Sequence, residues 1–301
     1  MSPEGRPTPI GSVGGLLGGS ATPNGTPTPV ATRYVGLTNV PASPPFEPLL
    51  LVTDEGLRAV IEEYLGEEVV DYGLMVKRLS DGKGVAVNAD KEFYAASLFK
   101  ILVMYEVFRQ RELGLLSFDE SLVFSPPYLE YGLGTLRWPL WSHVPIWDLL
   151  EAMVTESDNV AAIMLQDRVG GWNIIQDYQA IGLKHTVMDR EQLVTSAGDM
   201  ALWLEMISRG QELSEKSREQ MIELLAGQLI DDRLPKYLPE GIKVAHKTGN
   251  WDNATHDVGI VYAPSGAYVI AALSNKYWES EPIAELSARV YEYFEEQTAS
   301  K

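Results

Sequence analysis

The chain has 301 residues, of which 45% are hydrophobic and seven are Trp, so it has enough apolar side chains to form a core. Its formal charge of −18 repels phosphate backbones and anionic lipid, which argues against a nucleic-acid partner. It has no Cys, and its four His show no metal-ligand spacing, so we expect no disulfide, no metal site and no other cofactor.

The N-terminal region, residues 1–45, is rich in Pro, Thr, Gly and Ser and includes the run Thr22 to Pro29. This composition predicts a disordered tether, because it cannot bury enough apolar surface to offset the entropy of ordering. No stretch approaches the ~18 apolar residues of a membrane span, and the sequence does not begin with a signal peptide. A tether before a compact domain favours an extracytoplasmic protein (periplasmic, secreted or envelope-tethered) whose leader is absent from this sequence. The alternatives are an ordinary disordered tail and a cytoplasmic protein.

Residues 46–301 form the predicted domain, whose elements follow in the order helix, strands, several helices, strands, helix. Helices are predicted over residues 54–65, 97–113, 146–154, 160–168, 197–207 and 283–294. Strands are predicted over residues 72–79, 84–88, 243–246, 257–262 and 268–273, with a hairpin turn at 80–83. Strands from both ends of the chain can meet in one antiparallel sheet, with a helical lobe inserted at about residues 115–210. The sequence therefore predicts a mixed α/β (α+β) fold.

The first chemical motif is Ser97-Leu98-Phe99-Lys100. Residues three apart share one face of a helix, so the Lys100 amine can approach Oγ of Ser97. A lysine among apolar neighbours has a lowered pKa and can accept the serine proton, and the start of a helix favours a developing anion. The alternative is a helix N-cap followed by a solvated lysine, but the apolar run from Ile101 to Met104 is an unusual setting for a solvated charge.

Two further triplets follow, Ser157-Asp158-Asn159 and Lys247-Thr248-Gly249. Taken alone, the first is typical of a turn between helices with Asx capping, and the second of a strand that ends at a turn glycine. A glycine there would also let the backbone of a substrate approach the strand edge closely.

In this order, the three triplets resemble the Ser-x-x-Lys, Ser-Asp-Asn and Lys-Thr-Gly set of class A β-lactamases and penicillin-binding proteins. The spacing supports the resemblance, since 60 residues separate Ser97 from Ser157 and 90 separate Ser157 from Lys247. The resemblance covers about residues 50 to 297 and includes further matches at 93–96, 170–171 and 256–261. It implies a β-lactamase/transpeptidase-like fold, in which a five-stranded antiparallel sheet flanked by helices joins an all-helical lobe, with the site between them.

The resemblance also implies catalytic roles. Ser97 would attack the carbonyl carbon and form an acyl-enzyme, with Lys100 as the activating base. Ser157 would relay a proton to the departing ring nitrogen, assisted by the positive charge of Lys247.

The substrate-binding roles come from the same resemblance. Asn159 would hold the acyl-amide side chain of the substrate, and Thr248 would hold its carboxylate. The backbone N–H groups of Ser97 and Asn250, the residue after Gly249, would form the oxyanion hole.

The sequence departs from the family in the Ω-shaped loop, which carries the glutamate that orients the deacylating water. This loop should lie between Val187 and Met200, but its middle is missing. Glu191 is the candidate for the deacylating base, and the alternative is a surface carboxylate beside Arg190. Residues 257–262 also lack the carboxylate-binding arginine of many class A enzymes, a role in which Lys276 could substitute.

We therefore expect a serine hydrolase that opens β-lactams through an acyl-enzyme on Ser97. One alternative is a penicillin-binding-protein-like D-alanyl peptidase or esterase with slow deacylation. Another is an envelope-tethered, non-catalytic binding module, although such a module need not have kept Lys100 and Lys247. The expected partner is a small β-lactam or a D-alanyl peptide, and we expect a monomer.

Overall fold

The computed structural model describes residues 40–131, 138–189, 192–210 and 212–299. Residues 1–39, which hold most of the predicted tether, lie outside these ranges, as does the candidate base Glu191. Within the described ranges, no helix is both long enough and apolar enough to cross a membrane.

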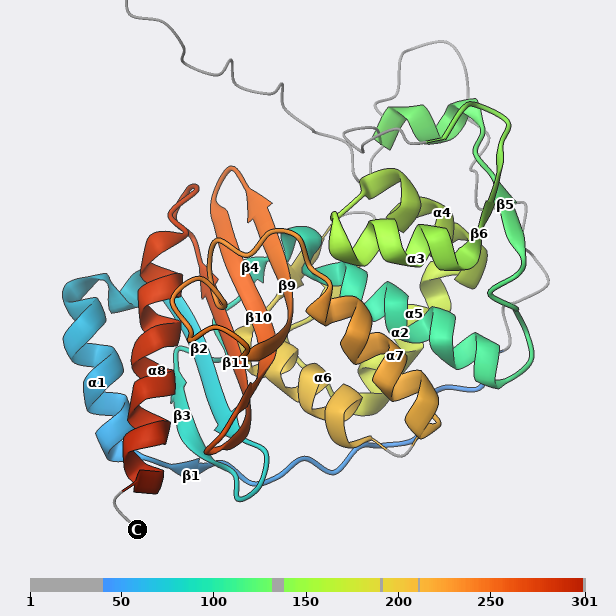
Figure 1. The fold of residues 1–301 in the computed structure, drawn as a ribbon. Helices are drawn as coiled ribbons and strands as arrows, with labels where there is room; N and C mark the ends of the chain where they lie inside the picture. Colours follow the sequence, from blue (N-terminus) through green and yellow to red (C-terminus); the bar gives the residue numbers. More distant parts are fainter. Residues whose placement is uncertain (1–39, 132–137, 190–191, 211, 300–301) are drawn as a thin grey trace, which may run out of the picture.

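The centre of the molecule is a mixed sheet with the strand order β1-β3-β2-β11-β10-β9 (Figure 1). Its strands are β1 (Val52–Thr53), β2 (Tyr72–Arg78), β3 (Lys83–Val87), β9 (Lys243–Trp251), β10 (Ala254–Ala263) and β11 (Gly266–Ser274). The five long strands pair antiparallel, as predicted, and the two-residue β1 adds a parallel strand beside β3. Strand β9 forms the opposite edge, so one side of the strand that carries Lys247 has no neighbouring strand among the described residues.

Strand β9 is longer than the predicted 243–246. It continues through the Lys-Thr-Gly triplet, because Thr248 pairs with Asp257 and Asn250 pairs with Thr255 on β10. The triplet therefore lies within a strand and not at a strand end. Nearly all residues of β10 are buried, as expected for a strand with both faces covered.

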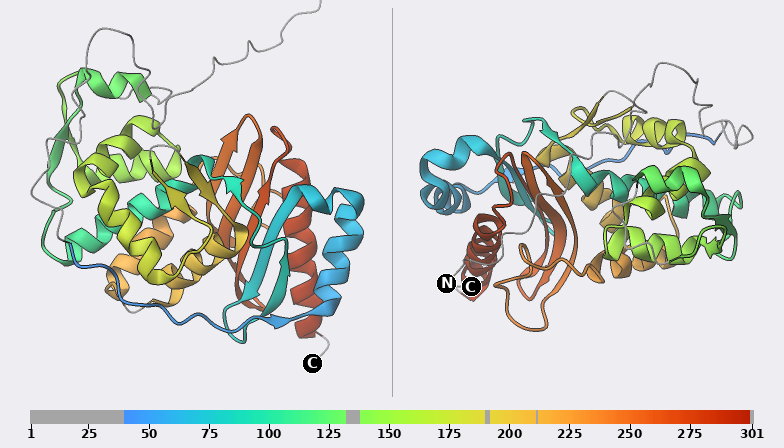
Figure 2. Two further views of the ribbon diagram at one scale, coloured as in Figure 1. Left: turned by 180° about the vertical axis from the view of Figure 1, so that it is seen from behind. Right: turned by 90° about the horizontal axis from the view of Figure 1, so that it is seen from above.

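Helices cover both faces of the sheet and form the second lobe. They are α1 (Glu55–Leu65), α2 (Phe99–Glu112), α3 (Ile146–Thr155), α4 (Asn159–Val169), α5 (Gly171–Ile181), α6 (Ala197–Arg209), α7 (Glu215–Ala226) and α8 (Glu281–Ala299). Helices α1 and α8 lie on one face of the sheet, and α6 lies on the other face, where the helical lobe begins (Figure 2). Each predicted helix is present, whereas α5 and α7 are additional.

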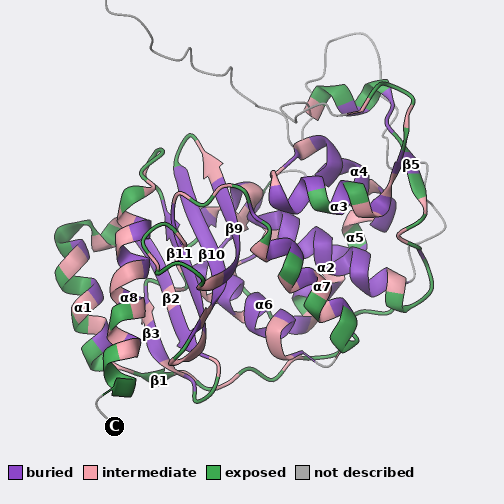
Figure 3. Ribbon diagram, in the orientation of Figure 1, coloured by how far each residue is buried: buried purple, intermediate pink, exposed green. Residues whose placement is uncertain are grey.

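The sheet separates two hydrophobic clusters. One lies between the sheet and the α1–α8 pair and includes Leu57, Ile270 and Phe294. The other starts on the opposite face and continues into the helical lobe, where it includes Leu149 and Trp203. The buried sides of α2, α3 and α6 turn toward this second cluster (Figure 3). This packing places the edge strand β9, which carries the third motif, against the helical lobe that carries the first two motifs.

Short elements complete the fold. They are the strands β4 (Phe93–Tyr94), β5 (Ser121–Val123), β6 (His143–Pro145), β7 (Val187–Met188) and β8 (Leu193–Thr195), and the 3₁₀ turns η3 (Gly66–Asp71), η4 (Ala96–Leu98) and η5 (Pro126–Tyr131). Strands β4, β8 and β7 form a small sheet, and β5 pairs with β6.

The segment before α1 crosses from the helical lobe to the sheet (Figure 2). The backbone N–H of Ser43 donates to Asp177 Oδ1 on α5 at 3.0 Å, and that of Leu49 donates to Glu205 Oε1 on α6 at 2.7 Å. Because Val40 and Ser43 are also buried, the packed chain includes residues that precede Phe46.

Candidate active site

Ser97 lies in the 3₁₀ turn η4, directly before α2. The predicted helix starts at this serine, whereas the α-helix itself begins two residues later at Phe99. The preceding residue, Ala96, has a φ of +47°, which is uncommon for a residue with a Cβ and is typical of functional sites. The half-buried Ser97 is therefore held on a sharp turn at a helix N-terminus, where the helix dipole favours an anion.

Lys100 joins the first two motifs through one fully buried amine. Its Nζ lies 3.2 Å from Ser97 Oγ and 3.1 Å from Ser157 Oγ. It also donates to the carbonyl oxygen of Ser157 at 2.6 Å and to Asn159 Oδ1 at 2.7 Å. The structure therefore places Ser97, Lys100, Ser157 and Asn159 together, although 57 residues separate Lys100 from Ser157.

Burial lowers the pKa of Lys100 well below its ordinary value, because a charged amine is poorly solvated there. The nearby charge of Lys247 lowers the pKa further, and Asp158 opposes both effects. A neutral amine within hydrogen-bond distance of Ser97 Oγ is able to accept the serine proton.

The Ser-Asp-Asn triplet both caps a helix and contributes side chains to the site. The side chain of Asp158 caps α4 by accepting a hydrogen bond from the N–H of Ala161 at 2.8 Å, as the turn interpretation predicts. Ser157 has a φ of +60°, a left-handed conformation that is uncommon for serine. This turn directs the carbonyl and hydroxyl oxygens of Ser157 onto Lys100 Nζ.

The third motif lies beside the Ser97 turn. A Cβ built on Gly249 would meet Leu98 Cγ and His256 Cδ2 at 3.3 Å each, so glycine allows β9 to approach the nucleophile closely. The buried Lys247 donates to the carbonyl of Thr248 at 3.2 Å. Burial lowers the pKa of Lys247 to about 7; the charge of Asp257 raises it, and that of Arg233 lowers it.

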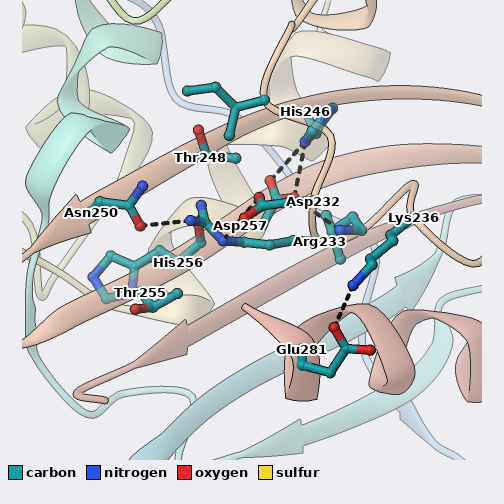
Figure 4. A network of polar contacts seen from close by, with 12 residues as sticks. Asp232, Arg233, Lys236, His246, Thr248, Asn250, Thr255, His256, Asp257 and Glu281 are labelled. Atoms are coloured by element: carbon teal, nitrogen blue, oxygen red, sulfur yellow. Dashed lines mark hydrogen bonds and ion pairs between the residues drawn. The ribbon is translucent and has the colours of Figure 1, made fainter. Parts of the chain in front are cut away.

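Arg233, which the sequence did not single out, is a further cation at this site (Figure 4). It comes from the loop between α7 and β9 and is only 1% exposed. Its Nη2 donates to Asn250 Oδ1 at 2.6 Å, and its Nη1 donates to the carbonyl of His256 at 3.0 Å. Its Nε lies 3.5 Å from Asp232 Oδ1. The ammonium of Lys276 also has carboxylate partners, at 3.2 Å from Asp71 and 3.5 Å from Glu68. Arg233 is therefore the cation that the structure places in contact with Asn250.

His256 is structural. Burial lowers its pKa to about 4, so the ring is neutral near pH 7. Its Nδ1 accepts the N–H of Ser274 at 3.1 Å, which leaves the proton on Nε2 to donate to the carbonyl of Tyr94 at 2.8 Å. Within the part of the chain that the structure describes, no group of three or more His, Asp and Glu side chains is arranged to hold a metal ion.

The loop that should carry the deacylating base connects the paired strands β7 and β8 of a hairpin. Met188 on β7 pairs with Leu193 on β8, and the N–H of Asp189 donates to the carbonyl of Gln192 at 3.0 Å. The connection is therefore short, as the sequence predicts, and Glu191 falls within it but outside the described residues.

The segment that leads into this hairpin is fixed by one carboxylate. Asp199, in the first turn of α6, accepts hydrogen bonds from the N–H groups of Lys184 and His185 and from the hydroxyl of Thr186. The base of the hairpin is thereby tied to α6.

The model of the β-lactamase enzyme family matches residues 54–294 of the chain. The chain belongs to this family. It is similar to the extended-spectrum β-lactamase PER-1 of Pseudomonas aeruginosa, with 26% identity over 244 residues, which are 72% of this chain and 78% of that protein. It is also similar to the β-lactamase AST-1 of Nocardia asteroides, with 28% identity over 274 residues, which are 85% of this chain and 83% of that protein.

Solved structures of family members have the same fold. The structure of PBP-A has a TM-score of 0.76 at 28% identity and covers 85% of this chain and 100% of that chain. The extended-spectrum β-lactamase TLA-1, solved as a single-residue variant, has a TM-score of 0.74 at 24% identity and covers 79% of this chain and 98% of that chain. The β-lactamase/transpeptidase-like fold is therefore confirmed, and with it the prediction of a serine β-lactamase-like hydrolase.

Proposed function

We propose that Ser97 is the nucleophile and that it opens β-lactams by forming an acyl-enzyme. The observation that carries the proposal is the position of the Lys100 amine, which lies within 3.2 Å of both Ser97 Oγ and Ser157 Oγ. One amine can therefore take a proton from the first hydroxyl and return it to the second.

The proton path follows from these contacts. As Oγ of Ser97 bonds to the lactam carbonyl carbon, its proton moves to Lys100 Nζ, and the carbonyl oxygen becomes an anion. The carbon–nitrogen bond of the ring then breaks, Ser157 gives its hydroxyl proton to the nitrogen, and Lys100 restores that proton. The product is an ester on Ser97, with all protons accounted for.

Other residues hold the substrate and its developing charges. The N–H groups of Ser97 and Asn250 receive the oxyanion, since β9 is an edge strand beside the Ser97 turn. Oδ1 of Asn159 accepts from Lys100, which leaves the Nδ2 group to donate to the acyl-amide carbonyl. Thr248 and Arg233 receive the carboxylate, because a guanidinium fork suits that group. Lys247 supplies positive charge along this side.

The short hairpin favours slow hydrolysis of the acyl-enzyme. In this proposal Glu191 holds the deacylating water, and a loop without the family-like length places that carboxylate less accurately. A displacement of ~1 Å can cost on the order of 10²-fold in rate. A second candidate function, slow hydrolysis of D-alanyl peptides or esters, is favoured by the same hairpin. The similarity to PBP-A, a mutant of which was solved as an acyl-enzyme complex with penicillin-G, supports acylation by a β-lactam.

The setting proposed for this activity is extracytoplasmic, with the residues before Val40 as a tether, and the acting unit is a monomer. The β-lactamase relatives and the Pro- and Thr-rich composition of the tether support this setting.

The test is intact-mass analysis after exposure to penicillin-G and to a chromogenic cephalosporin. We expect one covalent adduct on the wild-type protein, none on Ser97→Ala, and an unchanged adduct on Ser117→Ala, which removes an exposed hydroxyl elsewhere. An undiminished adduct on Ser97→Ala would assign the nucleophile to another residue.

A further inference from the structure

Asp257 on β10 is a buried carboxylate in a polar network that also includes His246 and Arg233 (Figure 4). It lies opposite Thr248 in the strand register, so its side chain is on the same face of the sheet as those of Thr248 and His246. The residue is fully buried, and a carboxylate in that position must be hydrogen-bonded to be tolerated.

Two donors from different parts of the chain contact it. His246 Nδ1 lies 2.9 Å from Asp257 Oδ1 and 3.0 Å from Oδ2. The backbone N–H of Leu234 donates to Oδ2 at 3.0 Å. The first contact orients the carboxylate, and the second ties the loop between α7 and β9 to β10. The hydroxyl of Ser287 on α8 holds the same loop from its other side, by donating to the carbonyl of Leu234 at 2.8 Å.

That loop carries Arg233, the residue immediately before Leu234. A backbone contact at Leu234 therefore helps to set the position from which the guanidinium reaches Asn250 Oδ1 and the carbonyl of His256. Arginine loses considerable rotamer freedom when it is fixed, so a pre-positioned guanidinium binds an anion with less entropic cost at the time of binding.

Asp257 also acts on the second cation of the site. Its negative charge raises the pKa of Lys247, whose side chain lies on the other face of β9, and so opposes the effect of burial. One carboxylate thus supports both the arginine and the lysine that face an anionic substrate group.

We propose that Asp257, oriented by His246, is a positioning residue for recognition of the substrate carboxylate, acting through Arg233. It does not touch the substrate; it holds the Arg233 loop against β9 and β10 so that the guanidinium lies beside Asn250. This inference rests on the proposed acylation of Ser97, and it adds that carboxylate recognition depends on a buried His–Asp pair.

The test compares benzylpenicillin with its methyl ester, which lacks the carboxylate and keeps the lactam. Second-order rate constants for acylation are measured by intact mass for the wild type, Asp257→Asn, Asp257→Ala and His246→Gln. The matched control is Asp231→Asn, which removes a charge from an exposed residue of the same loop.

We expect the wild type to prefer the acid over the ester by about 10- to 100-fold, the effect of a charge-assisted hydrogen bond. Asp257→Ala lowers this preference by about 10-fold or more. Asp257→Asn, which keeps one acceptor oxygen, and His246→Gln lower it less. Asp231→Asn keeps the wild-type preference.

Three outcomes separate the possibilities. A wild-type preference retained in folded Asp257→Ala overturns the inference; if the rates with both compounds fall equally, which also retains the preference, Asp257 has a merely structural role. If circular dichroism shows that Asp257→Ala does not fold, the acid-to-ester ratios of Asp257→Asn and His246→Gln test the inference: a ratio equal to that of the wild type in both overturns it. If the wild type forms no adduct with either compound, the proposed function fails, and this inference fails with it.

Discussion

Replacing Lys247 with Met removes a buried ammonium from the site and keeps a side chain of similar length. The lysine is fully buried, and burial lowers its pKa to about 7. Folding therefore costs free energy at neutral pH, because a group that is protonated in the unfolded chain must be desolvated or must lose its proton. We expect Lys247→Met to be more stable than the wild type and much less active.

The magnitude follows from the difference between the two pKa values. The pKa falls from its ordinary value of 10.5 to about 7 in the folded protein, and each unit corresponds to ~1.4 kcal/mol, which gives a cost of about 4 kcal/mol at pH 7. The hydrogen bond to Thr248, which Met cannot make, offsets ~1 kcal/mol of this gain. The net expectation is a stabilisation of about 2–3 kcal/mol, or about 5–10 °C in Tm.

The lowered pKa also determines how the stability of the protein changes with pH. Between pH 7 and pH 10.5 the unfolded chain holds a proton on Lys247 that the folded chain lacks, so wild-type stability gains from this group as pH rises. The Met variant has no such contribution, and its advantage over the wild type must shrink toward pH 10.

Urea unfolding at pH 7, 8.5 and 10 measures this advantage directly, and acylation kinetics on the same samples measure the loss of activity, expected at about 10²-fold or more. The matched control is Lys243→Met on the same strand, where the side chain is 38% exposed and no stabilisation is expected. A Lys247→Met protein that is less stable at pH 7, or whose advantage is the same at all three pH values, would refute the reasoning.

The site and the hairpin beside it lead to three more expectations. Lys100→Ala should slow acylation by about 10²–10⁴-fold with unchanged circular dichroism; near-normal acylation would mean that another base activates Ser97. The wild type should show a burst followed by slow turnover, and Glu191→Gln should prolong the acyl-enzyme; fast turnover that this substitution leaves unchanged would assign the water to another residue. Asp199→Ala should lower stability by about 2–3 kcal/mol in urea unfolding, because donors at residues 184–186 lose their acceptor; an unchanged midpoint would contradict this.

Much of the site could be predicted from the sequence because its chemistry is encoded locally. Ser97 and Lys100 are three residues apart at the start of a helix, and Asp158 caps the helix that begins at Asn159. Such spacings determine which side chains share a face without knowledge of the rest of the fold. Local spacing does not predict that these residues lie beside β9. That prediction also required the order of the three motifs along the chain.

Arg233 could not be predicted in this way. It belongs to no local pattern, and its position depends on hydrogen bonds to residues 17 and 23 positions further along the chain. Helix α7 was missed for a related reason: its sequence is largely polar, and only a few of its residues, such as Met221 and Leu225, are buried. Packing against other elements stabilises such a helix more than its own apolar pattern does.

The place of β11 in the sheet determines when the site can form during synthesis. This strand lies between β2 and β10, and Arg78 pairs with Tyr268, 190 residues further along the chain. Pairing across so long a loop costs closure entropy and is slow. Until Gly266–Ser274 has left the ribosome, β2 lacks its partner on that side, and β10 and β9 have no sheet to join. A chain that stops before this strand therefore carries Ser97 and β9 but lacks the strand that joins β9 and β10 to β2.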